Sequence, residues 1–381
     1  MLPRRSCLEV KIDGTDISEA VSDRILNFNY TDRASGDSDS VDLSLTDRDG
    51  KFIGDWYPEN GTEFRAKIKV ENWNSSGDSD ELDTGKFKID SCVLSGPPDK
   101  FSVKAVSIPI SSGLKQDEKS NTWEETTLQK IAQEIAGNAG VDLIYEVESD
   151  IQLDRVDQQQ QTDMSFLLDL CEKYGIALKV TDGKIVLFEE SVYEQKEAVD
   201  TFDKSEIGSR ILDYNFAQDT NGTVSKVELY YKDPKSGIVA QGEFAPPNPP
   251  KTGQKLILNE RPGDLRGDNY RNGVDTASKD PGGTFSTGFK EFNDITADFN
   301  KPRADTTDNA NRICKARCRE KNKKEWTCTL KLVGNVKMFG GVNINITNWG
   351  KYSGKYSVDV AAHDTGGRYA TTVNAHKVLG Y

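Results

Sequence analysis

The stretch Phe64-Arg65-Ala66-Lys67-Ile68-Lys69-Val70 alternates apolar and polar side chains without a break. Because successive side chains of a strand point to opposite faces, this alternation predicts an antiparallel strand with one face on a core. Turn residues such as Asn60-Gly61 separate it from its neighbours. The same alternation recurs in three more runs, at 41–45, 87–89 and 101–106. Residues 7–107 are therefore predicted to form a small antiparallel barrel or sandwich.

The middle of the chain changes to a helical period. An apolar stripe with the spacing i, i+3, i+4, i+7, i+8 predicts a helix from Trp123 to Gly140, at Leu128, Ile131, Ala132, Ile135 and Ala136. Asp163 is predicted to be the N-cap of a second helix, which ends at Gly175. The turn Asp182-Gly183 then joins the two strands of a hairpin. We expect both helices to pack on this hairpin in an α+β module.

A second β-rich part follows. Six runs are predicted to be strands, at 211–216, 224–231, 326–333, 342–346, 356–362 and 369–378. The segment 233–305 is rich in Pro, Gly, Asn and Asp and predicts a long loop. The segment 305–322 predicts a basic amphipathic helix. The economical interpretation is one barrel, built from 211–232 and 326–381 and split by an insertion.

These patterns predict a mainly β protein with an α+β insert, in which two small antiparallel, tube-like β-barrels flank a helix-containing module. The first barrel is assigned to residues 1–110, the insert to 111–200 and the second barrel to 201–381, with the long loop insertion 233–305. The length of 381 residues agrees with two or three domains, at roughly 100–200 residues each.

The composition disfavours several classes of protein. The chain carries 49 Lys and Arg against 62 Asp and Glu, a formal net charge of −13. Proteins that bind nucleic acid or anionic membranes need clustered basic side chains, so specific binding to nucleic acid or to a membrane surface is disfavoured. No stretch approaches the ~20 apolar residues of a membrane span. The start of the chain also lacks the apolar core of a signal peptide.

The residues that usually carry chemistry are few. The chain has six cysteines without a CxxC motif, so we expect a reduced protein whose cysteines are mostly core side chains. Cys314 and Cys318 lie on one face of a predicted helix, where packing is favoured over metal binding. The only two histidines are His363 and His376. His363 precedes Asp364, and a structural role at a strand end is favoured for it over that of a base.

We predict no catalytic, cofactor-binding or metal-binding residue and no cofactor, and hence no enzyme. A G-x-S-x-G elbow, a P-loop, a dinucleotide fingerprint and HExxH are all absent. Residues 268–279 depart from a calcium loop at Tyr270 and Lys279, and the tripeptide at 266–268 is a chance match to an adhesion motif. The basic run 315–324 is expected to be a solvated helix face or a contact with an acidic partner.

Three groups of segments are distinctive in their order and spacing. They are Asp83–Asp90 with Leu94–Pro98, then Leu128–Ala136 with Ser165–Gly175, and finally Gly341–Ile344, Gly354–Val358, His363 and Arg368–Thr371. Together they resemble the phage late control D family, which contains the baseplate hub of contractile phage tails and the N-terminal hub half of type VI secretion spike proteins. The resemblance covers most of the chain except 233–305, and Arg368 stands where the family more usually has Gly.

The resemblance implies a structural protein rather than an enzyme. Hubs of this family are homotrimers in which each subunit contributes two similar β-barrels. Three copies then form a ring of approximate six-fold symmetry, which joins a six-fold tail tube to a three-fold central spike. Duplication inside one chain provides the six matching patches of such a ring. The insert is expected to contact the surrounding baseplate (wedge) proteins.

The implied location is the baseplate of a virion or injection particle, assembled in the bacterial cytoplasm. DNA or cargo would pass through the ring without specific binding. Three copies would carry 3 × −13 = −39, and an acidic lining would keep DNA from adhering. Two alternatives stay open: a receptor-binding or adhesion tail component, for which the 233–305 segment is suited, and a cell-wall hydrolase with carboxylate catalysts in 115–195.

Overall fold

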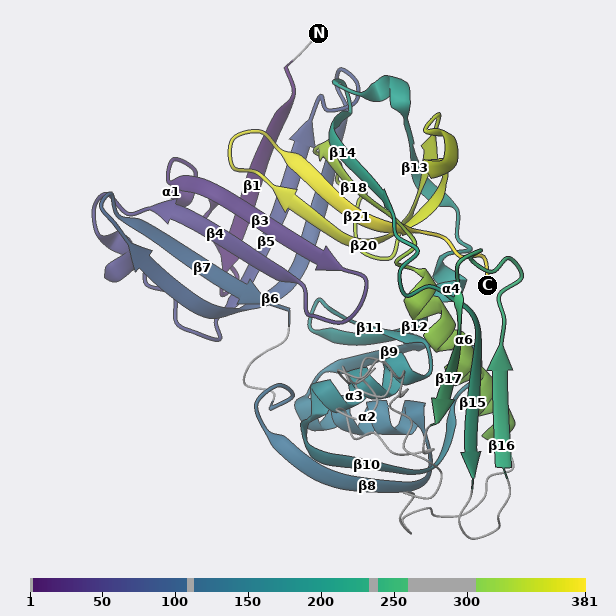
Figure 1. Cartoon of the computed structure of the whole chain (residues 1–381). Coiled ribbons are helices and arrows are strands. Elements are labelled where there is room, and N and C mark those ends of the chain that lie inside the picture. Colours follow the sequence, from purple (N-terminus) through teal and green to yellow (C-terminus); the bar gives the residue numbers. More distant parts are fainter. Residues whose placement is uncertain (1–2, 108–112, 233–238, 260–305) are drawn as a thin grey trace, which may run out of the picture.

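The computed structural model describes residues 3–107, 113–232, 239–259 and 306–381. As predicted, strands dominate it, and a helix-containing module lies beside two β-rich units (Figure 1). The segments considered as a calcium loop and an adhesion tripeptide lie outside the described residues. Within the described residues, no helix is long and apolar enough to span a bilayer.

The first β-rich unit follows the alternation of its sequence. Phe64, Ala66, Ile68 and Val70 are all buried, with the charged side chains between them on the outer face. Tight turns such as the one at Asn60-Gly61, where Gly61 has a positive φ, connect the strands. The elements are β1 (Arg5–Ile12), β2 (Thr15–Asp16), α1 (Ser18–Val21), β3 (Ile25–Arg33), β4 (Ser40–Thr46), η1 (Lys51–Ile53), β5 (Glu63–Glu71), β6 (Ser79–Ser95) and β7 (Lys100–Val106).

The second β-rich unit has its own apolar core around Tyr356, Leu330 and Ile344. As predicted, four strands come from the last part of the chain, and 211–218 joins them. The elements are β13 (Ala198–Asp203), η3 (Lys204–Glu206), β14 (Ile211–Gln218), β18 (Trp326–Val333), β19 (Asn343–Thr347), η5 (Gly350–Tyr352), β20 (Gly354–Asp364) and β21 (Ala370–Lys377).

The two units share one continuous 13-stranded sheet. Strand β20 pairs with β19 through Gly354–Ser357 and with β3 of the first unit through Val360–Asp364. A bulge between Val358 and Val360 separates the two stretches, and such a bulge re-aims a strand. The units are therefore joined by backbone hydrogen bonds, not only by loops.

The module confirms the predicted hairpin and both helices, with one boundary in error. The first helix begins at Leu128, because Trp123 belongs to a strand that pairs with 152–162. The second helix packs on the hairpin, as predicted, whereas the first helix packs on the strands 118–127 and 142–146. Side chains of both helices and of the hairpin, among them Ile176, Leu178 and Leu187, share one core. The elements are β8 (Glu118–Thr127), α2 (Leu128–Ala139), β9 (Asp142–Glu146), β10 (Gln152–Thr162), α3 (Asp163–Lys173), β11 (Ile176–Thr181), β12 (Lys184–Glu189) and α4 (Glu190–Tyr193).

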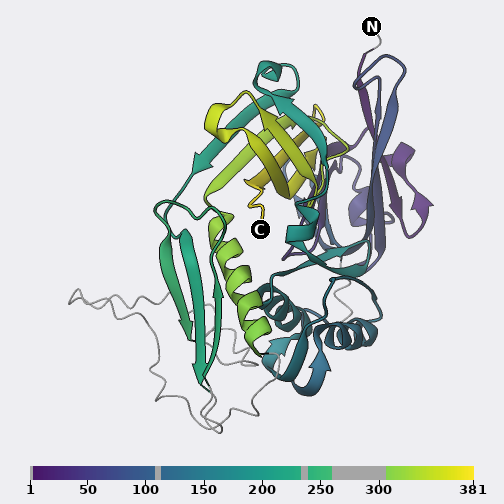
Figure 2. The same ribbon diagram turned by 90° about the vertical axis from the view of Figure 1, so that its right-hand side faces the viewer.

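A further small sheet lies beside the module, and it corrects two predictions. The strand predicted at 224–231 does not pair with β14 or β18. It pairs instead with two strands from the stretch predicted as a loop. Figure 2 shows the basic helix between this sheet and the module, and its buried side chains join the module's core. The elements are β15 (Val224–Lys232), β16 (Val239–Phe244), β17 (Gln254–Asn259) and α6 (Thr306–Asn322).

The N-cap of α3 differs by one residue from the prediction. Thr162 is the N-cap, and its hydroxyl accepts a hydrogen bond from the backbone N–H of Ser165 at 3.3 Å. The carboxylate of Asp163 is buried and binds Lys119 Nζ at 2.6 Å and Gln158 Nε2 at 3.0 Å. The aspartate therefore joins the helix to β8 and β10 rather than capping it.

We predict that Thr162→Ala lowers the free energy of unfolding by about 1 kcal/mol, the usual contribution of an N-cap hydroxyl. Ser165→Ala is the matched control, because Ser165 is exposed in the first turn of the same helix. It should stay within about 0.5 kcal/mol of the wild type. Thermal unfolding of the three proteins measures the difference, and equal effects of the two substitutions would argue against the cap.

Candidate assembly interface

The carboxylate of Asp32 on β3 joins three parts of the molecule. Its Oδ2 accepts a hydrogen bond from the Tyr30 hydroxyl at 2.7 Å. Its Oδ1 accepts from Lys179 Nζ of the module's β11 at 2.5 Å and from the backbone N–H of Gly340 in the second unit at 2.7 Å. Asp32 is buried, and a buried carboxylate is stable only with such partners. This residue therefore fixes the first unit, the second unit and the module relative to one another.

Gly340 is required by this junction. A Cβ at this position would lie 2.3 Å from the backbone N of Ala34 and 2.4 Å from the backbone C of Arg33. Only a glycine lets the loop of the second unit approach the end of β3 closely enough to donate to Asp32. No sequence pattern pointed to Asp32, Lys179 or Gly340, because 147 residues separate Asp32 from Lys179 and 308 separate it from Gly340.

The module's hairpin docks on the first unit through further hydrogen bonds. The hydroxyl of Ser107 donates to the backbone carbonyl of Val180 at 2.7 Å, and the N–H of Lys86 donates to Asp182 Oδ1 at 3.0 Å. Asp39 is fully buried at the same contact. Burial, together with the charge of Asp32, raises the pKa of Asp39 to about 7. The contact between the module's hairpin and the first unit is therefore held by directional polar interactions, which fix its position.

The basic helix α6 is neutralised inside the molecule. Arg319 and Arg317 are buried, and Arg319 Nη2 pairs with Glu194 Oε1 at 2.5 Å. Lys323 Nζ pairs with Glu190 at 3.0 Å. The expectation of a solvated helix face or a contact with an acidic partner was therefore wrong for these side chains. Of the acidic partners, Glu190 is the first residue of α4 and Glu194 directly follows that helix; the sequence pattern did not indicate either pairing.

The two histidines have opposite electrostatic surroundings. Burial lowers the pKa of His363 to about 4, and its ring lies 2.8 Å from both Tyr369 OH and the carbonyl of Met338. This supports the predicted structural role. Burial also acts to lower the pKa of His376, but the carboxylates of Asp359 and Glu194, at 2.8 and 3.1 Å, outweigh it and raise the pKa to about 9. His376 is thus a cation in a buried ion network.

The cysteines behave as predicted. Cys171, Cys314, Cys318 and Cys328 are buried core side chains, Cys92 is half-buried and Cys7 is exposed. Burial raises the pKa of the Cys171 thiol well above its usual value. Across residues 3–107, 113–232, 239–259 and 306–381, no group of three His, Cys, Asp or Glu is arranged to hold a metal ion.

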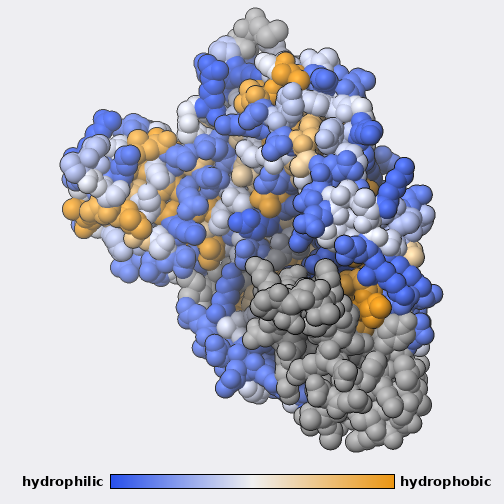
Figure 3. Space-filling model, in the orientation of Figure 1, coloured by the Kyte–Doolittle hydropathy of each residue, from blue (hydrophilic) through white to orange (hydrophobic). Residues whose placement is uncertain are grey.

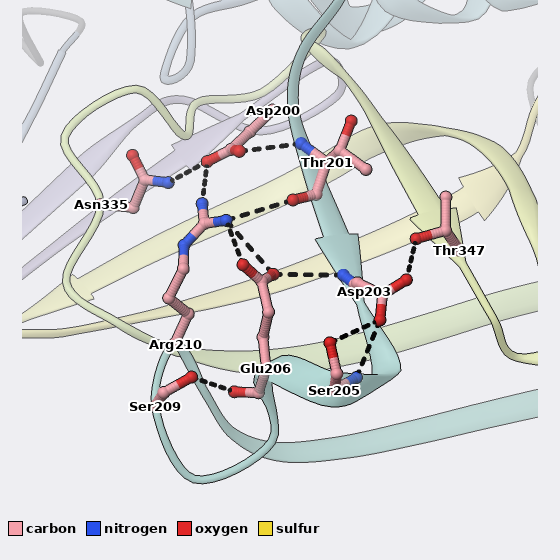
Figure 4. A network of polar contacts seen from close by, with 9 residues as sticks. All are labelled: Asp200, Thr201, Asp203, Ser205, Glu206, Ser209, Arg210, Asn335 and Thr347. Carbon is pink, nitrogen blue, oxygen red and sulfur yellow. Dashed lines mark hydrogen bonds and ion pairs between the residues drawn. The ribbon is translucent and has the colours of Figure 1, made fainter.

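A polar network closes the second unit between β13 and β14 (Figure 4). Arg210 Nη2 pairs with Asp200 at 2.5 Å, and Nη1 pairs with Glu206 at 3.0 Å and donates to the carbonyl of Thr201 at 3.2 Å. Asn335 Nδ2 also donates to Asp200, at 2.9 Å. The guanidinium therefore fixes the start of β14 against β13, although no strand pairing joins the two in the described residues.

Two strand segments combine an unpaired side with exposed apolar side chains. β14 is the last strand at one end of the sheet and pairs only with β18. Beyond Lys88, β6 has β7 on one side and no strand of the described chain on the other. Leu212 and Tyr214 are 50% and 44% exposed, and Val93 and Leu94 are 56% and 49% exposed. Such segments are typical of surfaces that pair with another chain.

The end of β6 belongs to an apolar tip of the first unit. Ile53 of η1, and Trp56 and Tyr57 just after it, are also exposed. Figure 3 shows this apolar surface at the far left of the molecule. It lies away from the junction at Asp32, so the internal contacts do not use it. The exposed apolar ends of these strands are therefore candidate surfaces for contact with another chain.

Two proteins of known phages are similar in sequence to part of this chain. Over 176 residues the chain is 28% identical to a protein of Escherichia phage P2 and 26% identical to one of Escherichia phage 186, both named "Probable baseplate hub protein". The chain is similar to phage baseplate hub proteins. The match covers 46% of this chain and 43% of each relative, so less than half of their length is matched. No family model matches the chain.

Solved structures match over almost the whole chain. A 43 kDa tail protein of the Shewanella oneidensis prophage MuSo2 covers 98% of this chain at 11% identity, with 97% of its own length matched and a TM-score of 0.63. A tail protein of Neisseria meningitidis covers 98%, with 98% of its length, 9% identity and a TM-score of 0.65. A type VI secretion component of E. coli covers 98%, with 78% of its length, 11% identity and a TM-score of 0.55. These matches confirm the predicted mainly β fold with a helix-containing insert, and together with the two phage relatives they confirm the resemblance stated from the motifs. The predicted closed barrels are not confirmed: among the described residues the strands of both units form one 13-stranded sheet, and no strand pairing closes either unit into a barrel.

We predict that Gly340→Ala destabilises the protein by about 2 kcal/mol or more, because the added methyl group displaces backbone atoms and removes a bond to Asp32. Gly137→Ala is the control. Gly137 lies in α2, and a Cβ there meets no atom within 4 Å, so this substitution should be neutral or slightly stabilising. Thermal unfolding compares them, and a Gly340→Ala protein as stable as the wild type would argue against the junction.

We predict a loss of stability above neutral pH that depends on His376. The pKa of His376 in the folded protein, about 9, exceeds the ordinary histidine value of 6.5, so its contribution to stability is complete below pH 6.5 and is lost as the pH rises through 9. At about 1.4 kcal/mol per pKa unit, the loss is at most about 3 kcal/mol. Denaturant unfolding at pH 6, 7.5 and 9.5 measures it. In His376→Gln the decline over this range should be smaller, and an unchanged decline would contradict the assignment.

Proposed function

We propose that the chain is the baseplate hub of a contractile phage tail or of a related injection particle. The observation that carries the proposal is the match of the whole fold to two phage tail proteins, together with the sequence match to two proteins named as baseplate hubs. The protein would act in the baseplate of the particle and assemble in the bacterial cytoplasm.

The proposed architecture is a homotrimer that joins a six-fold tail tube to a three-fold central spike. Each chain holds two β-rich units that share one sheet through β20 and β3, so three chains present six similar units. A ring of this kind matches both symmetries at once. The exposed segments of β6 and β14 supply surfaces on which neighbours can pack.

We assign the parts of the chain on the same basis. Residues 1–110 and 201–381 contain the two tube-like domains, and 111–200 is the insert. The small sheet of β15–β17 and α6 shares a core with the insert, so these elements act with it. Because this composite body protrudes from the two β-rich units (Figures 1 and 2), it is suited to contact the surrounding baseplate proteins.

We infer that the role is structural and not catalytic. Three of the buried charged groups, Asp32, Glu194 and His376, are engaged in ion pairs that hold elements together. DNA or cargo would pass through the ring without specific binding, since a trimer carries 3 × −13 = −39.

The proposal predicts a specific assembly. Coexpressed with the spike and tail-tube proteins of its own particle, the chain should purify as three copies of the 42.3 kDa chain bound to both. Native mass spectrometry measures the stoichiometry. A protein that stays monomeric and binds neither partner would refute the hub, and binding to whole cells without other tail proteins would favour the adhesion alternative.

A turbidity assay on purified peptidoglycan tests the structural role separately. The hub proposal expects no clearing above the buffer. Clearing by the purified chain would support the hydrolase alternative, and substitutions of carboxylates in 115–195 would then identify its catalysts.

A further inference from the structure

The two β-rich units share one strand order, with one difference in direction: β1 runs antiparallel to β5, whereas β13 of the second unit runs parallel to β19. In hydrogen-bonded order, the first unit runs β1-β5-β6-β7-β4-β3 and the second runs β13-β19-β20-β21-β18-β14. Numbered by their order along the chain, the six strands of each unit occupy the same places in the sheet. The equivalent of β6 in the second unit is therefore β20, and the equivalent of β3 is β14.

The sequences of the equivalent strands agree with this correspondence. Arg24-Ile-Leu-Asn-Phe-Asn at the start of β3 matches Arg210-Ile-Leu-Asp-Tyr-Asn at the start of β14. Gly85-Lys-Phe-Lys-Ile-Asp of β6 likewise matches Gly354-Lys-Tyr-Ser-Val-Asp of β20. These matches support the duplication inside one chain that the resemblance to the hub family implies.

The bulges and loop contacts fix the alignment residue by residue. The bulge of β3 at Ile25/Asn27 corresponds to that of β14 at Ile211/Asp213, and the bulge of β6 at Ile89/Ser91 corresponds to that of β20 at Val358/Val360. The hydrogen bond from Gly61 N to the carbonyl of Ile89, at 2.7 Å, also has its counterpart from Gly341 N to the carbonyl of Val358, at 2.8 Å.

Inside the chain, β20 of the second unit pairs with β3 of the first unit, and this pairing forms a junction between the units. Val360–Asp364 pair with Asn29–Arg33, with Ala362 opposite Thr31 and His363 opposite Tyr30. His363 and Tyr30 are buried there, and their rings stack at 5.8 Å. The equivalent segments, the end of β6 and β14, have no such partner in the described chain.

The residues equivalent to the covered ones are apolar and less buried. Leu94 of β6, 49% exposed, takes the position of the buried His363, and Phe216 of β14, which is half-buried, takes the position of the buried Tyr30. One chain thus presents a β6 end at one place and a β14 edge at another, each being half of a junction whose complete form is present inside the same chain. Because the two halves differ, copies joined in this way associate head to tail, and such a contact forms a ring where the rotation between copies closes.

We propose that Ser91–Ser95 of β6 in one copy pair antiparallel with β14 of a second copy, and so repeat the β20–β3 junction between subunits. This inference rests on the proposed ring-shaped hub and specifies how its copies join. The alignment sets the register: Val93 lies opposite Ala217 and Leu94 opposite Phe216, as Ala362 lies opposite Thr31 and His363 opposite Tyr30.

A designed disulfide tests this register. Paired residues of antiparallel strands have Cα atoms about 4.5–5.5 Å apart, within the range that a disulfide spans. Val93→Cys and Ala217→Cys are combined in a Cys7→Ser, Cys92→Ala background, and the assembled protein is oxidised. Non-reducing gels should show a ladder that ends at the trimer, with at least tenfold more linked product than either single variant. Mixing the two single variants should give linked dimers only.

Two matched pairs serve as controls. Thr31→Cys with Ala362→Cys repeats the design at the internal junction and should close within one chain, without a change in mass on the gel. Val93→Cys with Asn215→Cys is displaced by two residues and should link several-fold less. Under reducing conditions the Val93→Cys, Ala217→Cys protein should unfold at the temperature of its background, because both sites are exposed.

The outcomes separate this inference from the proposed function. If the trimer forms and the internal pair closes, but Val93→Cys does not link to Ala217→Cys or the displaced pair links equally well, the register is wrong and the hub proposal stands. If the ladder forms but the ring binds neither spike nor tube, the register stands and the hub proposal fails. A protein that stays monomeric at particle-forming concentrations overturns the pairing.

Discussion

The backbone groups along the edge of a strand need partners, and the edge of β20 determines how this molecule is built. The first half of β20 pairs with β19 and the second half pairs with β3, and the pairing partner changes at the bulge after Val358. That change carries β3 to the place where Asp32 meets Lys179 and Gly340. Since removing one partner of a buried charge is strongly destabilising, the module and both units are held in one arrangement.

Local patterns predicted those elements whose buried side chains repeat with a clear period. The stretch at 64–70 and the α2 stripe are examples, because one face of each is buried and the other is exposed. β8 was missed because it is exposed at most positions and its sequence has no apolar alternation. The pairing of β15 with β16 and β17 was also missed, since those partner strands lie in a segment whose Pro and Gly content predicts a loop.

The junction at Asp32 could not be predicted from local patterns of this kind. Asp32, Lys179 and Gly340 acquire their roles only when distant segments meet, and none of the three has a local motif. The charge of α6 shows the same limit. Its arginines and lysines suggested a partner in the sequence, but Glu190 and Glu194 of the same chain neutralise Lys323 and Arg319. The amino-acid composition gives the number of charged side chains, but which of them are exposed depends on the fold.

The duplicated strand starts show how one unit compensates for a missing neighbour. Arg24 makes a two-pronged contact with the turn residue Asp49, at 2.6 and 2.9 Å, while β20 supports the far side of β3. Arg210, at the same position of the second unit, instead binds Asp200 and Glu206 and so ties β14 to β13. β14 has no strand on its outer side within the described chain, and this network orders the start of that strand. An edge ordered in advance loses less conformational freedom on pairing, which would favour the proposed association of copies.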